Sequence, residues 1–266
     1  MFCFKKKEVY DFIVSMGGAC SCTTLLRKCK LQDFSYPYDW IGGIPLKGRI
    51  ELMLSGFKDW FHIEDFVKTG SRLNPEPCDI CKNTKTDLLY VHDFPLNIPI
   101  EESFESVKNK YDRRIKRMLD NINNAQRVCL VYIEPNESDN VYTMEYLKEC
   151  YKILKEAYPD KVFKIKYIYS SKEEPLTEHE EGVDLYKLDY SSHEIEPPPG
   201  YVNMKVLKSC FKNVKLKRKF TLKKLMDFIF SYRVSKRDYT TKITVTIFGI
   251  SFQKKYKKTV ESKDNA

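Results

Sequence analysis

The apolar positions of the chain alternate between short hydrophobic runs and longer segments with helical spacing. Five runs rich in β-branched and aromatic residues predict strands, because each is short and most are bounded by glycine or proline. These runs lie at 9–18, 87–94, 127–135, 161–169 and 182–190. Segments with apolar residues three and four positions apart predict helices, and they lie at 20–31, 46–62, 101–124 and 140–157.

The order of these elements predicts the fold class. Strands and helices alternate along the chain, which is typical of an α/β fold with a mainly parallel sheet and helices on both faces. The segment 69–86 is polar and contains Pro75 and Pro77, so we expect a loop there. Near the C-terminus, the pattern predicts a small appendage made of a basic helix and a hairpin that turns near Gly249.

Charge and proline content divide the chain into two parts. The proline-rich segment 194–200 is typical of a linker, so we expect a domain at 1–200 and a basic tail at 201–266. Residues 1–204 carry a net charge of −5, whereas residues 205–258 carry +15. The basic character of the protein therefore belongs to its tail.

Composition excludes several classes of protein. With 266 residues, 42% of them hydrophobic, the chain is long and apolar enough to bury a core. It contains no apolar run of about 18 residues, so no membrane-spanning helix is expected. Nine cysteines without a recognisable signal peptide indicate reduced thiols, and we expect a cytoplasmic protein.

The segment 13–22 has the most suggestive chemistry. Its predicted strand ends in Gly17 and Gly18, and Cys20 lies at the start of the next helix. The free amides and the dipole of a helix N-terminus stabilise a thiolate, and the same amides can hold a developing oxyanion. The two glycines would let a substrate approach the backbone. A buried cysteine beside an ordinary turn fits this local sequence equally well.

His92 stands at the end of the predicted strand 87–94. If that strand runs parallel to the strand ending at Gly17, His92 and Cys20 reach the same sheet edge, where ligand sites of α/β proteins form. The two side chains then fit a nucleophile and its base. Three acids are candidates to orient the imidazole: Asp39, Asp93 and Asp189. The alternative is that His92 and Asp93 only cap local structure.

Three further groups of residues have both a functional and a structural interpretation. The aromatic loop 35–43 would line a pocket or cover the edge of the core. The helical arginines Arg113 and Arg117 would grip a phosphate or carboxylate, or simply complement the helix dipole. Cys78 and Cys81 form a lone CxxC pair, and a zinc site needs about four ligands, so we expect no metal and no cofactor.

Four motifs, in this order, resemble a bacterial family of unknown function named as putative papain-like cysteine peptidases (DUF1796-type). They are SMGGAC at 15–20, SYPYDW at 35–40, VHDFP at 91–95 and KYDRRIKRM at 110–118. The resemblance extends from about residue 10 to residue 190 and implies that Cys20 is a nucleophile and His92 its base. We therefore predict Cys20, His92 and Asp39 as catalytic residues, and a substrate-binding set of Gly17, Gly18, Trp40, Asp93, Arg113 and Arg117.

The tail has a pattern of its own. Apolar residues recur at helical spacing between Leu222 and Phe230, with lysines and arginines around them. This pattern is typical of a basic helix lying on anionic lipid. We therefore expect residues 205–258 to attach the protein to an anionic surface on the inner face of a membrane. The pattern fits nearly as well if these apolar residues pack against the domain at 1–200. The tail contains no nucleic-acid recognition motif.

Three hypotheses for function follow. The first is a thiol-dependent hydrolase or acyl-transfer enzyme acting on a peptide, acyl or glycan-linked substrate. The second is a non-peptidase enzyme or ligand-binding protein of bacterial surface-glycan assembly, in which the helix of Arg113 and Arg117 holds an acidic ligand. The basic ending with Phe-Gly-Ile at 248–250, which resembles the endings of bacterial surface-polysaccharide enzymes, points the same way. The third is a non-catalytic interaction protein tethered by its tail.

Overall fold

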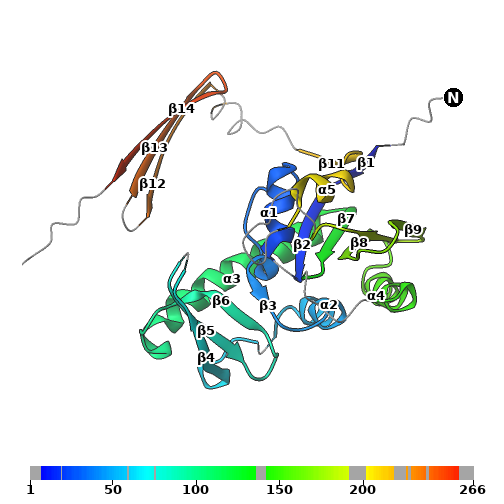
Figure 1. Ribbon diagram of the computed structural model, residues 1–266, viewed down its shortest axis with the longest axis horizontal. Helices are drawn as coiled ribbons and strands as arrows, with labels where there is room; N and C mark the ends of the chain where they lie inside the picture. The colour runs from blue at the N-terminus through cyan, green and yellow to red at the C-terminus, as the bar shows by residue number, and fades with distance from the viewer. Residues whose placement is uncertain are drawn as a thin grey trace, which may run out of the picture. The chain divides into compact units, whose positions relative to one another are not determined.

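The computed structural model describes residues 7–18, 20–58, 60–74, 76–135, 142–191, 202–218, 226, 229–237 and 240–257 (Figure 1). The chain divides into two compact units, residues 1–217 and 218–266. Residues 202–217, which the sequence assigned to the tail, therefore belong to the first unit. Among the described residues, no helix is both long and apolar enough to cross a bilayer.

The largest sheet of the first unit has five strands in the order β2–β7–β8–β10–β9. Four of them run parallel: β2 (Phe12–Gly18), β7 (Arg127–Ile133), β8 (Val162–Ser170) and β10 (Val183–Leu188). The edge strand β9 (Leu176–Glu180) is antiparallel to β10. Strand β7 is buried on both faces after Arg127, which explains why its sequence is a continuous apolar run.

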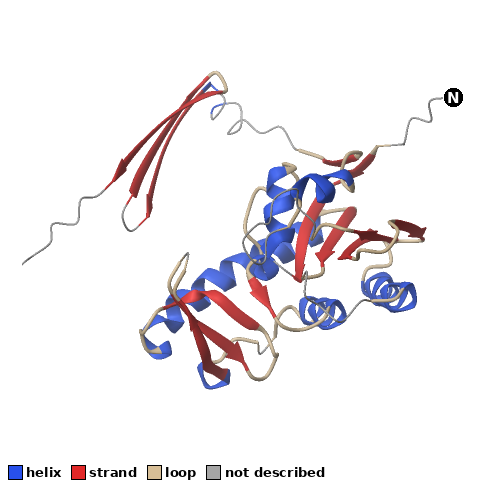
Figure 2. Ribbon diagram, viewed as in Figure 1, coloured by secondary structure: helices blue, strands red, loops and turns tan. Residues whose placement is uncertain are grey.

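Helices cover both faces of this sheet, as predicted (Figure 2). On one face, α1 (Cys20–Lys28) and α5 (Met204–Ser209) bury apolar residues in a core with Ile13, Val131 and Ile168. The opposite face packs against three helices: α2 (Leu46–Leu54), α3 (Ile100–Asn124) and α4 (Met144–Ala157). Helix α2 is shorter than the predicted 46–62, because Gly56 adopts the left-handed conformation that ends helices.

A second sheet of four antiparallel strands makes the molecule a mixed α/β structure. Its order is β3 (Ile41–Gly42), β6 (Leu89–Pro95), β5 (Cys78–Asn83) and β4 (Phe66–Arg72). The prediction of a mainly parallel sheet is therefore not confirmed for the molecule as a whole. One expectation is wrong: the strand that carries His92, β6, belongs to this antiparallel sheet and does not run beside β2.

The polar segment predicted as a loop at 69–86 also differs from the expectation. It contains most of β4 and all of β5, which pair as an antiparallel hairpin. Pro77 falls between the two strands, where it does not interrupt the pairing, and Pro75 lies outside the described residues. Helix α3 packs on this sheet through aromatic rings, and Tyr111 lies 5.3 Å from Tyr90 between ring centroids. This packing fixes β6, and with it His92, on the first unit.

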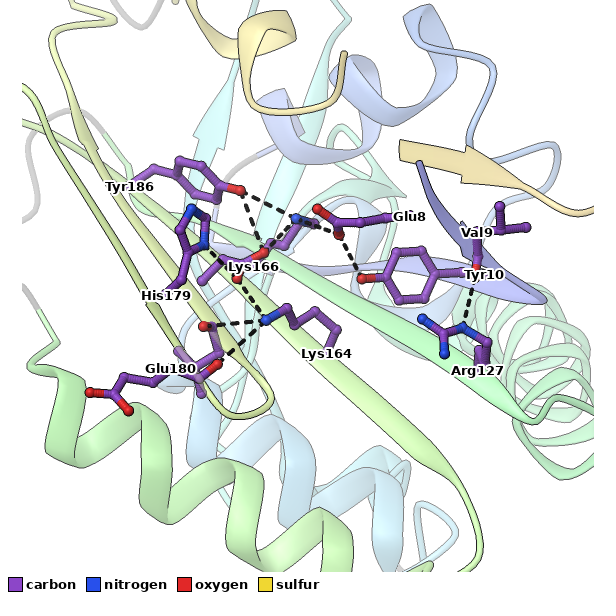
Figure 3. A network of polar contacts seen from close by, with 11 residues as sticks. Glu8, Val9, Tyr10, Arg127, Lys164, Lys166, His179, Glu180 and Tyr186 are labelled. Carbon is purple, nitrogen blue, oxygen red and sulfur yellow. Dashed lines mark hydrogen bonds and ion pairs between the residues drawn. The ribbon is translucent and has the colours of Figure 1, made fainter. Parts of the chain in front are cut away.

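A buried ion network joins the N-terminal strand to the large sheet (Figure 3). Strand β1 (Glu8–Tyr10) pairs in parallel with β11 (Val214–Leu216). The Lys166 ammonium, which is fully buried, contacts Glu8 Oε2 at 3.0 Å and Asp184 Oδ2 at 2.5 Å. Burial raises the pKa of Asp184, but Lys166 and Lys164 outweigh burial and hold this pKa below its usual value. The paired charges thus anchor β1 and β11 without leaving the Lys166 charge unpaired.

The second unit is a three-stranded antiparallel sheet of β12 (Phe230–Arg237), β13 (Thr240–Ile247) and β14 (Ile250–Lys257). The hairpin predicted near Gly249 is confirmed as β13–β14. Most of the apolar helical stripe predicted from Leu222 onward lies outside the described residues, and its last residue, Phe230, begins β12.

Gly18→Ala tests the close contact between Gly18 and the main chain at the end of β7. Gly18 has φ = +80°, and a Cβ added there would lie 2.0 Å from the main-chain oxygen of Ile133. We expect Gly18→Ala to lower the free energy of unfolding by about 2–4 kcal/mol, measured by urea denaturation. The control is Gly42→Ala, because its added Cβ would meet nothing closer than 3.7 Å. An equal effect of the two substitutions would contradict this reading of the turn.

Candidate active site

The turn between β2 and α1 is held in one conformation by steric contact. Gly17 and Gly18 both have positive φ, +89° and +80°, which side-chain-bearing residues rarely adopt. An added Cβ at Gly17 would lie 2.3 Å from Nη1 of Arg49, a fully buried arginine. The backbone NH of Gly17 also donates to Ser15 Oγ at 3.1 Å. The chain therefore leaves the carboxyl end of a parallel strand along a fixed path and begins α1 at Cys20.

Cys20 occupies the first residue of α1, and its side chain is solvent-exposed. The amides of a first helical turn have no partner within the helix, so they are available to an anion at this position. Cys20 is the one exposed cysteine in the part of the chain that the structure describes. By contrast, burial raises the pKa of Cys22, Cys129 and Cys150 to about 12. The accessible thiol is thus also the one placed at the helix start.

His92 lies on β6 and is about half-buried. Its Nδ1 is 2.9 Å from Nη2 of Arg72, and its ring meets the Trp40 ring edge-on at 5.8 Å between centroids. Burial and the Arg72 cation hold the pKa of His92 below its usual value, so the imidazole is neutral at pH 7. A guanidinium only donates hydrogen bonds, so Nδ1 accepts, and the ring proton is on Nε2.

A series of ring and cation contacts connects α1 to His92. Arg27 follows Cys20 by two helical turns on the same stripe of α1, about 10 Å along the axis. Its guanidinium lies over the Trp40 ring, 5.5 Å from the centroid, and Trp40 in turn meets His92. These contacts connect Trp40 and His92 to Arg27, in the last turn of α1. None of them joins the Cys20 and His92 side chains directly.

Asp39, predicted to orient the imidazole, is fully buried and has other partners. Its carboxylate accepts hydrogen bonds from Gln32 Nε2 at 2.9 and 3.0 Å and from the backbone NH of Tyr36 at 3.0 Å, and Arg27 lies 3.6 Å away. Burial raises its pKa despite these contacts. Asp39 therefore holds the 3-10 turn Pro37–Asp39 that presents Trp40. The group bonded to His92 Nδ1 is Arg72, not a carboxylate.

Asp93 and Arg117, predicted to bind substrate, both make contacts that connect elements of the fold. The carboxylate of Asp93 accepts hydrogen bonds from the ammonium of Lys110 and from Tyr111 Oη at 2.7 Å, which ties β6 to α3. Arg117 Nη1 donates to the main-chain oxygen of Ser35 at 2.8 Å, which ties α3 to the aromatic loop.

The contacts of the other residues singled out in the sequence do not involve the turn before Cys20. Arg113 is exposed on α3. Asp189 accepts hydrogen bonds from the backbone NH and the Oγ of Ser191. Cys78 and Cys81 lie on β5 and are buried, and Cys78 Sγ donates to Val91 O at 3.1 Å. Among the described residues, no group of three or more His, Cys, Asp and Glu side chains is arranged to hold a metal ion.

Three arginines around the site were missed by sequence reasoning. Arg27 could have been found, because it lies seven residues after Cys20 and therefore on the same helix stripe. Arg72 could not be found, because its segment was interpreted as a loop and its pairing with β5 was unknown. Arg49 looks like an ordinary polar residue of α2, and only the structure brings its guanidinium against Gly17.

Comparison with known proteins gives one match. A family model described as "Putative papain-like cysteine peptidase (DUF1796)" matches residues 11–171, which is more than half of the chain. The matched range contains the glycine turn, Cys20, Trp40, His92 and the whole of α3. Neither a curated protein nor a solved structure matches the chain.

We expect Cys20 to be the most reactive thiol of the folded protein at neutral pH, because it is exposed and lies at a helix start. Competitive labelling with a limiting amount of iodoacetamide, followed by peptide mass spectrometry, measures this order directly. Cys29 is the internal control, since it is partly exposed while burial raises its pKa. Labelling of Cys78 or Cys81 ahead of Cys20 would show that the assignment is wrong.

Proposed function

The chain belongs to the family of putative papain-like cysteine peptidases (DUF1796), and from this premise we propose that it is a thiol-dependent hydrolase or acyl-transfer enzyme. Cys20 is the nucleophile and His92 the base in this proposal. The observation that carries it is the exposed thiol at the first residue of α1, directly after a glycine turn at the carboxyl end of a parallel strand. This is where α/β folds gather reacting groups.

The proposed reaction has two steps. The Cys20 sulfur attacks a substrate carbonyl, its proton passes to His92, and the oxyanion is held by amides of the first turn of α1. The tetrahedral intermediate then expels the leaving group, which takes the proton from His92, and a thioester remains on Cys20. Water or another acceptor attacks the thioester, gives its proton to His92 and regenerates the thiol.

Arg72 controls whether His92 can serve as a base. While Nδ1 accepts from Arg72, the neutral ring carries its proton on Nε2, which can donate a hydrogen bond but cannot take a proton. Proton uptake at Nε2 requires the ring proton to move to Nδ1, and therefore requires Arg72 to withdraw. The Arg72 guanidinium is otherwise bound to the main-chain oxygen of Glu76. A carboxylate or phosphate on the substrate would attract this cation away from His92.

The alternative, a protein of glycan assembly that binds an acidic ligand with Arg113 and Arg117, has less support. Arg117 is already bonded to Ser35 and lies over the Phe34 ring at 5.1 Å. Of the two arginines, Arg113 alone is exposed. A single exposed arginine gives little selectivity for a phosphate, since such sites use several donors. The thiol chemistry therefore remains the proposal.

Trapping of an acyl-enzyme tests the proposed function. The full chain is mixed with p-nitrophenyl acetate, quenched in acid and mapped by peptide mass spectrometry. We expect acetylation of Cys20 in a rapid burst, because a thioester precedes hydrolysis. Cys20→Ala should abolish the burst, whereas the control Cys29→Ala should keep it. A burst that survives Cys20→Ala, or an acetyl group on another cysteine, would contradict the proposal.

A further inference from the structure

The C-terminal sheet has one apolar face and one polar face. Residues paired across an antiparallel sheet share a face. Phe230 pairs with Ile247, and Ile247 with Ile250. In the next row of the same face, Tyr232, Val245 and Phe252 are paired. The alternate positions are polar, and they include Thr244, Thr246, Ser251, Gln253 and Lys255.

Within the second unit, the described residues leave the apolar face exposed. The side chains of Ile250 and Phe252 are 64% and 62% exposed, and Ser231 is the one buried residue in the described part of this unit. A three-stranded sheet gains stability by burying its hydrophobic face against another surface. An exposed apolar patch of this kind marks an interaction site. The question is therefore which surface covers it.

The hairpin tip extends the apolar face. Phe248 and Gly249 form the turn between β13 and β14, and both have positive φ, +46° and +78°. This turn geometry matches the twist of a hairpin, but it is unfavourable for a bulky residue such as phenylalanine. Phe248 is nevertheless 68% exposed. The strained position thus presents an aromatic ring at the end of the sheet, beside Ile250.

The net charge of the second unit indicates which kind of surface covers the apolar face. The unit 218–266 contains 13 Lys and Arg against 4 Asp and Glu, a net charge of +9. Lys254 stands at the margin of the apolar face, its ammonium 5.2 Å from the centroid of the Tyr256 ring, and Lys255 is exposed on the polar face. We propose that this sheet docks on an anionic lipid surface, with the Phe248 turn and the apolar face among the acyl chains and the lysines at the headgroups.

Two other occupants fit less well. A second copy would bring two units of charge +9 face to face, and their repulsion opposes association. Nucleic acid would attract the charge, but aliphatic side chains such as Ile247 and Ile250 gain nothing from a phosphate backbone. An anionic bilayer satisfies both the charge and the apolar face.

Vesicle binding by the full chain tests this proposal. We expect sedimentation with vesicles of phosphatidylglycerol and phosphatidylcholine at low salt, weaker binding at high salt, and little binding to phosphatidylcholine alone. The double variant Phe248→Ser/Phe252→Ser should weaken the apparent Kd by at least about ten-fold, because both rings lose their place in the acyl region. The control Thr244→Ser/Gln253→Ser, on the polar face, should bind within about two-fold of the parent.

A second variant keeps the test valid if the double serine variant fails to fold. Lys254→Gln/Lys255→Gln keeps every apolar side chain of that face and should weaken binding at low salt but not at high salt. Unchanged vesicle binding in both variants would overturn the proposal. The proposal would also be overturned if the parent chain did not sediment with vesicles but formed dimers or bound duplex DNA. None of these measurements depends on Cys20, so their failure leaves the proposed thiol chemistry untouched.

Discussion

The structure of the candidate site depends on one steric constraint, the absence of side chains at Gly17 and Gly18. Both residues have positive φ, and a Cβ at either one would meet the Arg49 guanidinium or the end of β7. Because the chain passes through this narrow space, α1 begins at Cys20 directly beyond the carboxyl end of β2. The thiol is exposed there while the rest of α1 buries Cys22, Leu25 and Leu26 against the sheet.

Sequence periodicity predicted the parts of this fold that are buried on a regular face. Helix α3 and strands β7, β8 and β10 were found within a few residues, because their apolar residues follow the period of the element. Strands β4 and β5 were missed, because β4 is mostly exposed and neither strand has a clear apolar alternation. The sheet to which β6 belongs was also unpredictable, since pairing between distant strands leaves no local signal. The glycine turn and Cys20 were predictable for the opposite reason, because their geometry is local.

The polar contacts around His92 explain why its partner was not predictable. Sequence reasoning looked for a carboxylate, but two of the predicted acids have other partners: Asp39 is bonded to Gln32 and Tyr36, and Asp93 to Lys110 and Tyr111. The partner is a cation from a different hairpin, Arg72, which keeps the imidazole neutral. The proposed site would therefore combine an exposed thiol with a histidine whose ring proton is held on Nε2. Substrate binding at Arg72 would then couple to the activation of His92.

The central claim is that His92 acts on the Cys20 thiol, and the pH profile of Cys20 alkylation tests it most directly. The rate of iodoacetamide labelling at Cys20 is measured from about pH 5 to 10 in the parent chain, in His92→Ala and in the control His62→Ala, which removes an exposed imidazole. In this account the Nε2 proton of the neutral His92 ring stabilises the thiolate as a hydrogen-bond donor, so the midpoint of the profile should move to higher pH in His92→Ala alone. A profile that is the same in all three proteins would contradict the account.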